Sequence, residues 1–379
     1  MSTLPTPIPN HQVPYETRTE ELQEKSRNGT FDLNDVPGYV PGQQPDPAIW
    51  QNLDYQEIYP QIWGRKCGST GIGQLKEVAL TTITPHERNP MVDVDPGFFH
   101  KWEAPFTSLD IPRMQEQSAE YQAALEAAGV IVHRVEFPDP PVSPFGPLTY
   151  MWAARELLIL NGGSVIPKPG WTPLSVGRAE YLALWAFREL SIPPIRAIVG
   201  TGVCEAGPCF YLAEDVFVGA LSVAFNQEGI DQLYDTVRRT TNHEVEFLTI
   251  NCPTREYFDP QSGASGHPDM VLGPLDVDKV IMYPGGVDYK THCWLADRDY
   301  TIVEVERDEQ VLYAPANVVL VEPGVVIMMK EAKKAVAAVR AAGVEVIEVS
   351  YSEFPKAGGS LHCSTMEIYR EPGPFSTDR

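Results

Sequence analysis

The most informative stretch of this chain is Gly358-Gly359-Ser360-Leu361-His362-Cys363-Ser364-Thr365, near the C-terminus. A cysteine follows a Gly-Gly turn and stands at the mouth of a strand in which Met366 and Ile368 alternate with polar residues. Glycine accepts a positive φ and lets the backbone approach a ligand closely. We therefore expect the Cys363 thiol to face a substrate rather than fill the core, the commoner place for a cysteine.

A second motif, Gly266-His267-Pro268-Asp269, precedes the apolar run 270–272. Side chains two positions apart on an extended segment point to the same face, so we expect His267 and Asp269 to look into one pocket. A cysteine, a histidine and a carboxylate form a triad in which the base generates or stabilises the thiolate and later activates water. The two motifs together predict nucleophilic catalysis.

Composition excludes several classes of partner. The chain has 379 residues, is 43% hydrophobic and 21% charged, and carries a formal net charge of −22, which disfavours nucleic acid and anionic membranes. It contains no apolar run long enough to span a membrane, and its first ten residues lack the features of a secretory signal. The six cysteines follow neither a disulfide nor a zinc pattern. We expect a cytoplasmic protein with a small-molecule ligand; a homo-oligomer is compatible with the sequence.

The chain divides into two parts by composition. Residues 1–60 are rich in Pro, Asn, Gln and Asp, which cannot build an independent core, so we expect an extended N-terminal arm that wraps the main body. Residues 61–379 are expected to form a single catalytic domain.

Within that domain, a unit of strand, strand, helix and strand recurs five times, with Val/Ile-rich strands and helices of 3.6-residue apolar spacing. The predicted helices span 114–128, 178–190, 227–239 and 332–342, and the predicted strands span 76–84, 130–137, 157–160, 164–167, 195–199, 216–223, 245–250, 270–272, 279–282, 300–305, 317–321, 325–329 and 344–349. The class is α/β, and the repeat suggests a pseudosymmetric architecture. An ordinary open α/β sheet is compatible with the same periodicity. No dinucleotide-binding glycine fingerprint is present.

Two further acids are candidate site residues because of the overall pattern of motifs. Glu156 lies in Ala154-Arg155-Glu156 and Glu205 in Cys204-Glu205-Ala206-Gly207-Pro208, each just before an apolar strand, where a solvated turn acid is the ordinary interpretation. From about residue 61 to the end, however, the chain resembles the guanidine-modifying superfamily of amidinotransferases, arginine deiminases and dimethylarginine hydrolases. The resemblance rests on the Cys363 stretch, which is most similar to the amidinotransferase form, on His-x-Asp, and on the two acidic segments in the same order.

The resemblance implies a fivefold pseudosymmetric β/α propeller and a covalent mechanism. Cys363 would attack the guanidino carbon and expel an amine, leaving a thiouronium adduct that water or an acceptor amine resolves. His267 would move protons, and Glu205 would orient and charge-stabilise it. Glu156 and Asp269 would accept hydrogen bonds from the planar substrate. No metal and no cofactor are implied.

Departures from the family pattern bear on the substrate. Alanines stand at 224 and 357, where arginine-type members carry arginines that grip the substrate α-carboxylate, and Pro208 replaces an aspartate. A carboxylate buried without its bidentate partner is costly. Arg178 is the remaining basic candidate for substrate binding. We therefore expect a hydrolase acting on a small guanidine without an amino-acid head group, such as electron-poor nitroguanidine. The alternatives are an amidinotransferase and a non-catalytic binding protein.

Overall fold

A computed structural model describes residues 13–35, 41–42, 55–84, 109–136, 142–143, 146–147, 156–170, 177–255, 257–259 and 261–378. The chain divides into two compact units, Met1–Lys66 and Cys67–Arg379. All six predicted site residues belong to the second unit. So do Ala224 and Ala357, which stand where arginine-type family members carry arginines. No helix in these ranges combines the length and the apolar character that crossing a membrane requires.

The first unit contains helices where extended chain was expected. They are α1 (Val13–Arg27), the short 3-10 helix η1 (Leu33–Asp35) and α2 (Tyr55–Trp63). The segment 15–27 has no proline and is rich in Glu, Gln, Lys and Arg, all good helix formers, so local propensity outweighs the proline-rich composition of its surroundings. Wrapping of the arm around the main body stays a prediction.

The second unit is a mixed α/β fold built from small sheets, as the sequence predicts. Its described residues form five three-stranded sheets and one two-stranded sheet. The three-stranded sheets, in spatial order, are β17 (Thr365–Arg370), β1 (Leu75–Thr81) and β2 (Ile131–Val135); β5 (Leu158–Leu160), β6 (Gly163–Ile166) and β7 (Pro194–Ala197); β8 (Phe210–Ala213), β9 (Val216–Leu221) and β10 (Glu246–Asn251); β11 (Leu272–Asp276), β12 (Lys279–Met282) and β13 (Thr301–Glu304); and β14 (Val319–Glu322), β15 (Val325–Met329) and β16 (Glu345–Val349). The two-stranded sheet pairs β3 (Val142–Ser143) with β4 (Gly146–Pro147).

All five sheets repeat one pattern of pairing. The first strand is antiparallel to the second, and the second is parallel to the third. A parallel neighbour requires a crossover connection, which a helix supplies. In the described residues of the unit, the helices are α5 (Ile111–Ala127), α7 (Arg178–Leu190), α8 (Gln227–Arg239), α9 (Tyr289–Ala296), α10 (Arg307–Tyr313) and α11 (Lys333–Ala341), and the 3-10 turns are η5 (Pro268–Met270), η6 (Pro284–Gly286), η7 (Pro355–Ala357) and η8 (His362–Ser364).

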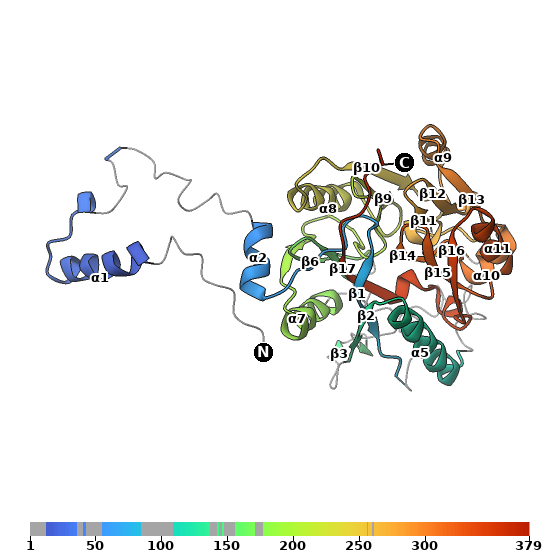
Figure 1. The fold of residues 1–379 in the computed structure, drawn as a ribbon, viewed down its shortest axis with the longest axis horizontal. Helices are drawn as coiled ribbons and strands as arrows, with labels where there is room; N and C mark the ends of the chain where they lie inside the picture. The colour runs from blue at the N-terminus through green and yellow to red at the C-terminus, as the bar shows by residue number, and fades with distance from the viewer. Residues whose placement is uncertain are drawn as a thin grey trace. The chain divides into compact units, whose positions relative to one another are not determined.

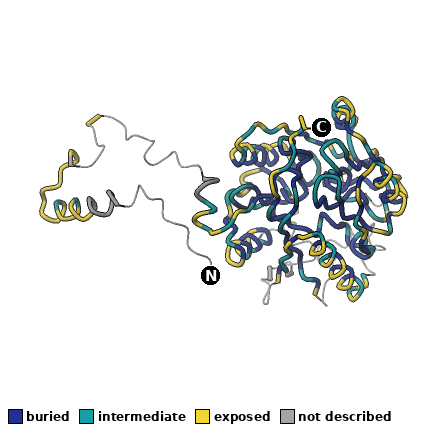
Figure 2. Tube along the Cα trace, in the orientation of Figure 1, coloured by how far each residue is buried: buried dark blue, intermediate teal, exposed yellow. Residues whose placement is uncertain are grey.

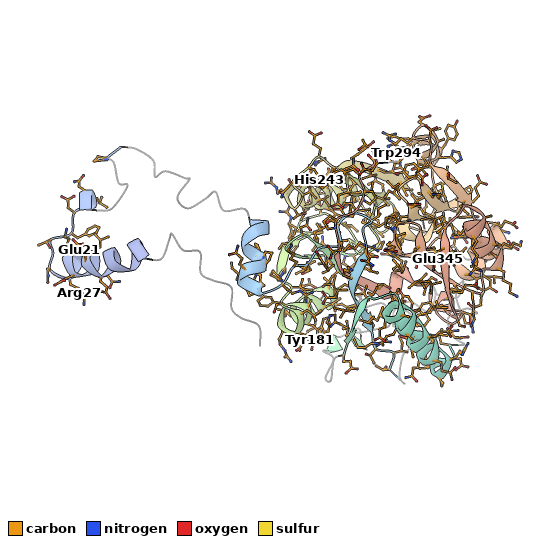
Figure 3. The ribbon with its side chains drawn as sticks, viewed as in Figure 1. Glu21, Arg27, Tyr181, His243, Trp294 and Glu345 are labelled. Carbon is orange, nitrogen blue, oxygen red and sulfur yellow. The ribbon has the colours of Figure 1, made fainter. Side chains whose placement is uncertain are left out.

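The helices lie around the outside of this unit, with the strands between them (Figure 1). Buried residues concentrate on the strands and on the inner faces of the helices (Figure 2). Figure 3 shows Tyr181 on α7, Trp294 on α9 and Glu345 on β16 in well separated parts of the unit. A small cavity is lined by the first strand of every three-stranded sheet, through Leu158, Phe210, Pro274, Leu320 and Glu367. The five first strands therefore face one another in the middle of the unit.

Most predicted elements are confirmed, and the differences have local causes. The predicted ranges lack the two short strands β3 and β4, the strand β8, whose short apolar run follows directly on a Gly-Pro turn, and α10, a short helix without a clear apolar stripe. Helix α9 falls in a segment that the sequence marks only as irregular and possibly helical. The segment 268–270 is a 3-10 turn rather than the start of an extended strand, because Pro268 opens a tight turn there.

A buried ion pair stabilises the closing strand. Arg370 donates to both oxygens of Glu367 at 2.6 and 3.0 Å, to the carbonyl of Gly73 at 2.9 Å and to that of Leu320 at 2.7 Å. Ser69 also donates to Glu367 at 2.5 Å. The guanidinium thus connects three chain segments around the central cavity.

We predict that Arg370→Ala lowers the free energy of unfolding by about 3–5 kcal/mol, because it deprives a buried carboxylate of its cation and two buried carbonyls of their donor. Urea unfolding followed by circular dichroism measures the loss. Arg239→Ala is the matched control: its partner Asp235 and Arg239 itself are exposed on α8, so the change should cost much less than Arg370→Ala. Equal losses for the two variants would contradict a structural role for the buried pair.

Candidate functional site

The turn that carries Cys363 is fixed by glycine and by buried hydroxyl groups. Gly358 ends η7 with a φ of 86°, a conformation that favours glycine, as the sequence analysis expected. Ser364 accepts a hydrogen bond from Tyr351 at 2.8 Å, and Thr365 contacts the hydroxyl of Tyr121 at 2.6 Å. Both tyrosines are fully buried, so the short helix η8 is braced from the protein interior. Cys363 itself is half-buried.

Asn317 connects the Cys363 turn to the motif that contains Asp269. Its Oδ1 accepts the backbone N–H of Cys363 at 3.1 Å. Its Nδ2 donates to the carbonyl oxygen and to Oδ2 of Asp269, each at 3.1 Å. Only 2% of Asn317 is exposed, so these bonds form away from water, where an unmade hydrogen bond is expensive. One buried amide therefore sets the position of the nucleophile relative to the acid.

Asp269 lies beside the Cys363 thiol and pairs with His362, the residue directly before the cysteine. Its Oδ2 is 3.7 Å from Cys363 Sγ and 2.7 Å from Nδ1 of His362. The sulfur also contacts Sδ of Met270 at 3.4 Å. Asp269 is buried, with 2% of its surface exposed. The structure thus brings together the predicted nucleophile and one predicted acid, which are 94 positions apart in the chain.

His267 and Asp269 differ from the expectation in one respect. They lie on the 3-10 turn η5 and its N-cap rather than on an extended segment, so the alternation argument for a shared face does not apply. His267 instead contacts Glu205, with 2.9 Å between Nε2 and Oε2. Tyr257 donates its hydroxyl to the other oxygen of Glu205 at 2.7 Å. Glu205 is therefore held between an imidazole and a phenol.

The chain between Tyr257 and His267 explains why both reach the same carboxylate. The N–H of Gly266 donates to the carbonyl of Tyr257 at 2.9 Å, and Ser265 Oγ donates to that carbonyl at 2.8 Å. Ser265 Oγ also accepts the N–H of His267 at 3.1 Å. The segment folds back on itself, and the two rings meet edge to face with centroids 5.6 Å apart.

Charge in this region favours the protonated form of His267. Burial opposes protonation, but the hydrogen bond to Glu205 and the negative charges of Glu205, Asp269 and Glu156 outweigh it, so the pKa of His267 is raised above its ordinary value of 6.5. The contribution of Glu156 and Asp269 shows that three predicted acids act on this imidazole.

Glu156 forms a buried ion pair with Arg178. The distance from Oε1 to Nη1 is 3.2 Å, and the two side chains are 10% and 5% exposed. Substrate binding by either residue stays a prediction. Ala224 accepts the backbone N–H of Glu205 at 3.2 Å, so it adjoins the site, whereas Ala357 packs in an apolar cluster with Tyr351 and other residues.

Two residues of this region, Asn317 and Tyr257, were not singled out by the sequence. Asn317 was read as the first residue of a strand, and Tyr257 lies in a polar loop with no motif of its own. Their contacts join residues 46 and 52 positions apart, which no local pattern reports. In the described part of the chain, no three His, Cys, Asp or Glu side chains gather as a metal site would require.

Comparisons with known proteins agree with this picture. The model of the arginine deiminase family matches residues 288–370. The 2-nitroimidazole nitrohydrolase of Mycobacterium sp. (strain JS330) is 37% identical over 360 residues, which cover 92% of this chain and 95% of that protein.

Solved structures of low sequence identity share the fold. The amidinotransferase SxtG of Microseira wollei, from the saxitoxin biosynthetic pathway, has a TM-score of 0.60 at 17% identity, covering 81% of this chain and 97% of that chain. A variant of dimethylarginine dimethylaminohydrolase from Pseudomonas aeruginosa, complexed with citrulline, has a TM-score of 0.58 at 19% identity, covering 78% and 100%. Sequence relationship, fold and motif order agree, and the chain belongs to the guanidine-modifying superfamily.

Proposed function

We propose that this protein hydrolyses a C–N bond of a small, planar, electron-poor compound whose reacting carbon is bonded to three nitrogens, with Cys363 as the nucleophile. The chain is an enzyme of the C–N hydrolase class. The observation that carries the substrate proposal is the 37% identity to a 2-nitroimidazole nitrohydrolase over nearly the full length of both chains. A 2-nitroimidazole or nitroguanidine is the proposed substrate type.

Both compounds have features that the sequence predicts for the substrate: they are small and electron-poor, and they lack an amino-acid head group. Carbon 2 of a 2-nitroimidazole is bonded to two ring nitrogens and the nitro nitrogen, so it resembles the central carbon of a guanidine. Neither compound carries an amino-acid head group, which suits a chain with Ala224 beside Glu205 and Ala357 within an apolar cluster. The nitro group withdraws electrons, so the carbon is open to attack without prior protonation of the substrate.

The proposed reaction has two steps. The Cys363 thiolate forms a C–S bond with the reacting carbon. With a 2-nitroimidazole, the bond from that carbon to the nitro nitrogen breaks and nitrite leaves with the bonding electron pair; with nitroguanidine, the bond to an amino nitrogen breaks and ammonia leaves after that nitrogen takes a proton from His267. His267 then removes a proton from water, the water oxygen forms a C–O bond, and the C–S bond breaks to regenerate the thiolate. With a 2-nitroimidazole, the sum is substrate plus water giving the imidazolone and nitrous acid, which ionises to nitrite.

The neighbours of these two residues support the assignment. Glu205 orients His267 and stabilises the imidazolium that forms when water is deprotonated, and Tyr257 holds Glu205 in turn. Asn317 fixes the backbone of the nucleophile. We assign Glu156 and Asp269 to the substrate side of the site, and no metal or cofactor takes part in this scheme.

We also propose that the five three-stranded sheets are the blades of a fivefold β/α propeller. Their common strand order, and a cavity lined by the first strand of each, support this arrangement.

We place the enzyme in the cytoplasm, since its six cysteines follow no disulfide pattern.

We predict that Cys363→Ala lowers kcat by about 10⁴-fold or more, because the covalent route is lost. The matched control is Cys293→Ala on the peripheral helix α9, which should retain activity. Iodoacetamide should label Cys363 before Cys204 and Cys252, because burial raises the pKa of both thiols, that of Cys252 to about 12. Activity in Cys363→Ala within tenfold of the wild type would refute the mechanism.

The pH dependence of kcat/KM should report His267. Because the neutral imidazole is the base, activity should fall as the pH drops through the pKa of His267, which is raised above 6.5. Glu205→Gln removes the negative partner and should move this acid limb to lower pH, with a loss of about 10²-fold or more in rate. Tyr257→Phe removes a donor that withdraws charge from Glu205, so it should move the limb to higher pH. A limb that stays in place in both variants would count against this assignment.

Substrate preference is testable by product release. Nitrite formation from 2-nitroimidazole and ammonia formation from nitroguanidine should exceed any turnover of arginine by about tenfold to a few hundredfold in kcat/KM. The reason is that Ala224 and Ala357 stand where family members carry the arginines that pair with the α-carboxylate of arginine. Nitrite and ammonia assays, each with and without an added amine, measure this. Product that forms only with the amine would make the enzyme a transferase, and a preference for arginine would contradict our interpretation of the alanines.

A further inference from the structure

Helix α10 presents a buried amide to the loop that carries His267. Gln310, on this helix, donates through Nε2 to the carbonyl of Gly263 at 3.1 Å and to that of Met270 at 3.0 Å. Gly263 lies four residues before His267, and Met270 lies three residues after it. A single NH2 group therefore ties together the two ends of the segment that contains the proposed base.

Packing alone does not account for this amide. Gln310 is fully buried, and its Oε1 has no hydrogen-bond donor among the described residues. A buried polar atom without a partner is costly, and an apolar side chain of the same length would fill the position without that cost. The two donations to the loop are what glutamine offers here and such a side chain does not.

Gly263 allows α10 to approach the loop closely. Its φ of 75° favours glycine, and a Cβ atom on it would lie 2.8 Å from Cγ of Gln310, nearer than carbon atoms normally approach. Arg307 lies one turn before Gln310 on the same face of α10 and donates to the carbonyl of Gln261 in the same loop. Two side chains of one helix face thus hold this loop.

The next helix fixes α10 in turn. The buried carboxylate of Glu309 accepts the backbone N–H groups of Lys334 and Ala335, each at 2.8 Å, at the start of α11. Such N–H groups have no acceptor within their own helix, so an acid from a neighbouring element stabilises them. The loop is therefore held by a helix that is itself anchored to another part of the unit.

The position of the loop decides the contact between His267 and Glu205, whose side chains are 2.9 Å apart. Burial lowers the pKa of His267, but the hydrogen bond to Glu205 and the charge of that acid raise it, and the charges of Asp269 and Glu156 act in the same direction. Tyr257 holds the other oxygen of Glu205 at 2.7 Å. A displacement of about 1 Å would loosen the contact, and errors of that size can cost about 10²-fold in rate.

We propose that Gln310 is a positioning residue for the base: by holding the carbonyls of Gly263 and Met270, it keeps His267 against Glu205 for the deprotonation of water. This inference rests on the proposed function for the role of His267. Gln310 acts through the loop rather than on the substrate.

The variant Gln310→Met tests the proposal, because it removes the amide and keeps the length of the side chain. Loosening of the contact with Glu205 should lower the pKa of His267. NMR titration of the full chain with labelled histidine measures this pKa, and His267→Gln identifies the signal among the eight histidines. The acid limb of kcat/KM for nitrite release from 2-nitroimidazole should move to lower pH, and kcat should fall by about tenfold to a hundredfold.

Two further variants sharpen the measurement. Gln117→Met is the matched control: Gln117 on α5 is also fully buried, and its Nε2 donates to the hydroxyls of Ser350 and Ser352 at 3.2 and 3.0 Å. The pKa of His267 should not change in this control. Gln310→Asn keeps the amide on a side chain one methylene shorter, so it should lower the pKa in the same direction. It also tests the position should Gln310→Met fail to fold, as thermal unfolding reports.

The outcomes separate this proposal from the one on which it rests, because the NMR titration needs no turnover. An unchanged pKa of His267 in the folded Gln310 variants, or an equal fall in Gln117→Met, would overturn the positioning role even if kcat is lower. A fall of the pKa in the Gln310 variants alone, in a protein whose wild type does not hydrolyse 2-nitroimidazole, would support the role of Gln310 and contradict the proposed reaction.

Discussion

The pairing of β17 with β1 is the constraint on which the rest of the second unit depends. These antiparallel strands join the C-terminal end of the unit to its beginning, with Val78 opposite Glu367 and Leu80 opposite Thr365. Cys363 lies on the turn directly before β17, so the same pairing that completes the first sheet delivers the thiol to the site. The buried Glu367–Arg370 pair anchors this strand from the central cavity.

The candidate site is assembled from loops that belong to different sheets. Glu205 precedes β8, Asp269 precedes β11, Asn317 precedes β14 and Cys363 precedes β17. Each of these strands is the first of its sheet, and the first strands face one another around a common cavity. A repeated architecture therefore brings equivalent loops together, and the chemistry comes from different residues on each. Loops positioned by a rigid scaffold commonly carry function in this way.

Buried polar groups here position the reacting atoms, and the hydrogen bonds between them offset the cost of their burial. Asn317 bonds both Asp269 and the backbone of Cys363, and Tyr257 shares Glu205 with His267. Such networks are stable only when most members find partners, and they then hold side chains in one arrangement. The pairing also offsets the negative charge of the acids locally, although the chain as a whole carries −22.

The sequence by itself determined the α/β class, most strands and helices, the superfamily and the identity of the candidate nucleophile. These follow from patterns within a few residues: apolar periodicity for the elements, and Gly-Gly before Cys363 for the turn. Only the tertiary structure decided which acid contacts which base. His362 meets Asp269 across 93 positions, Tyr257 meets Glu205 across 52, and Arg178 pairs with Glu156 rather than standing apart. Spacing along the chain constrains neighbours within one strand or turn, whereas these contacts arise because separate sheets pack around one centre.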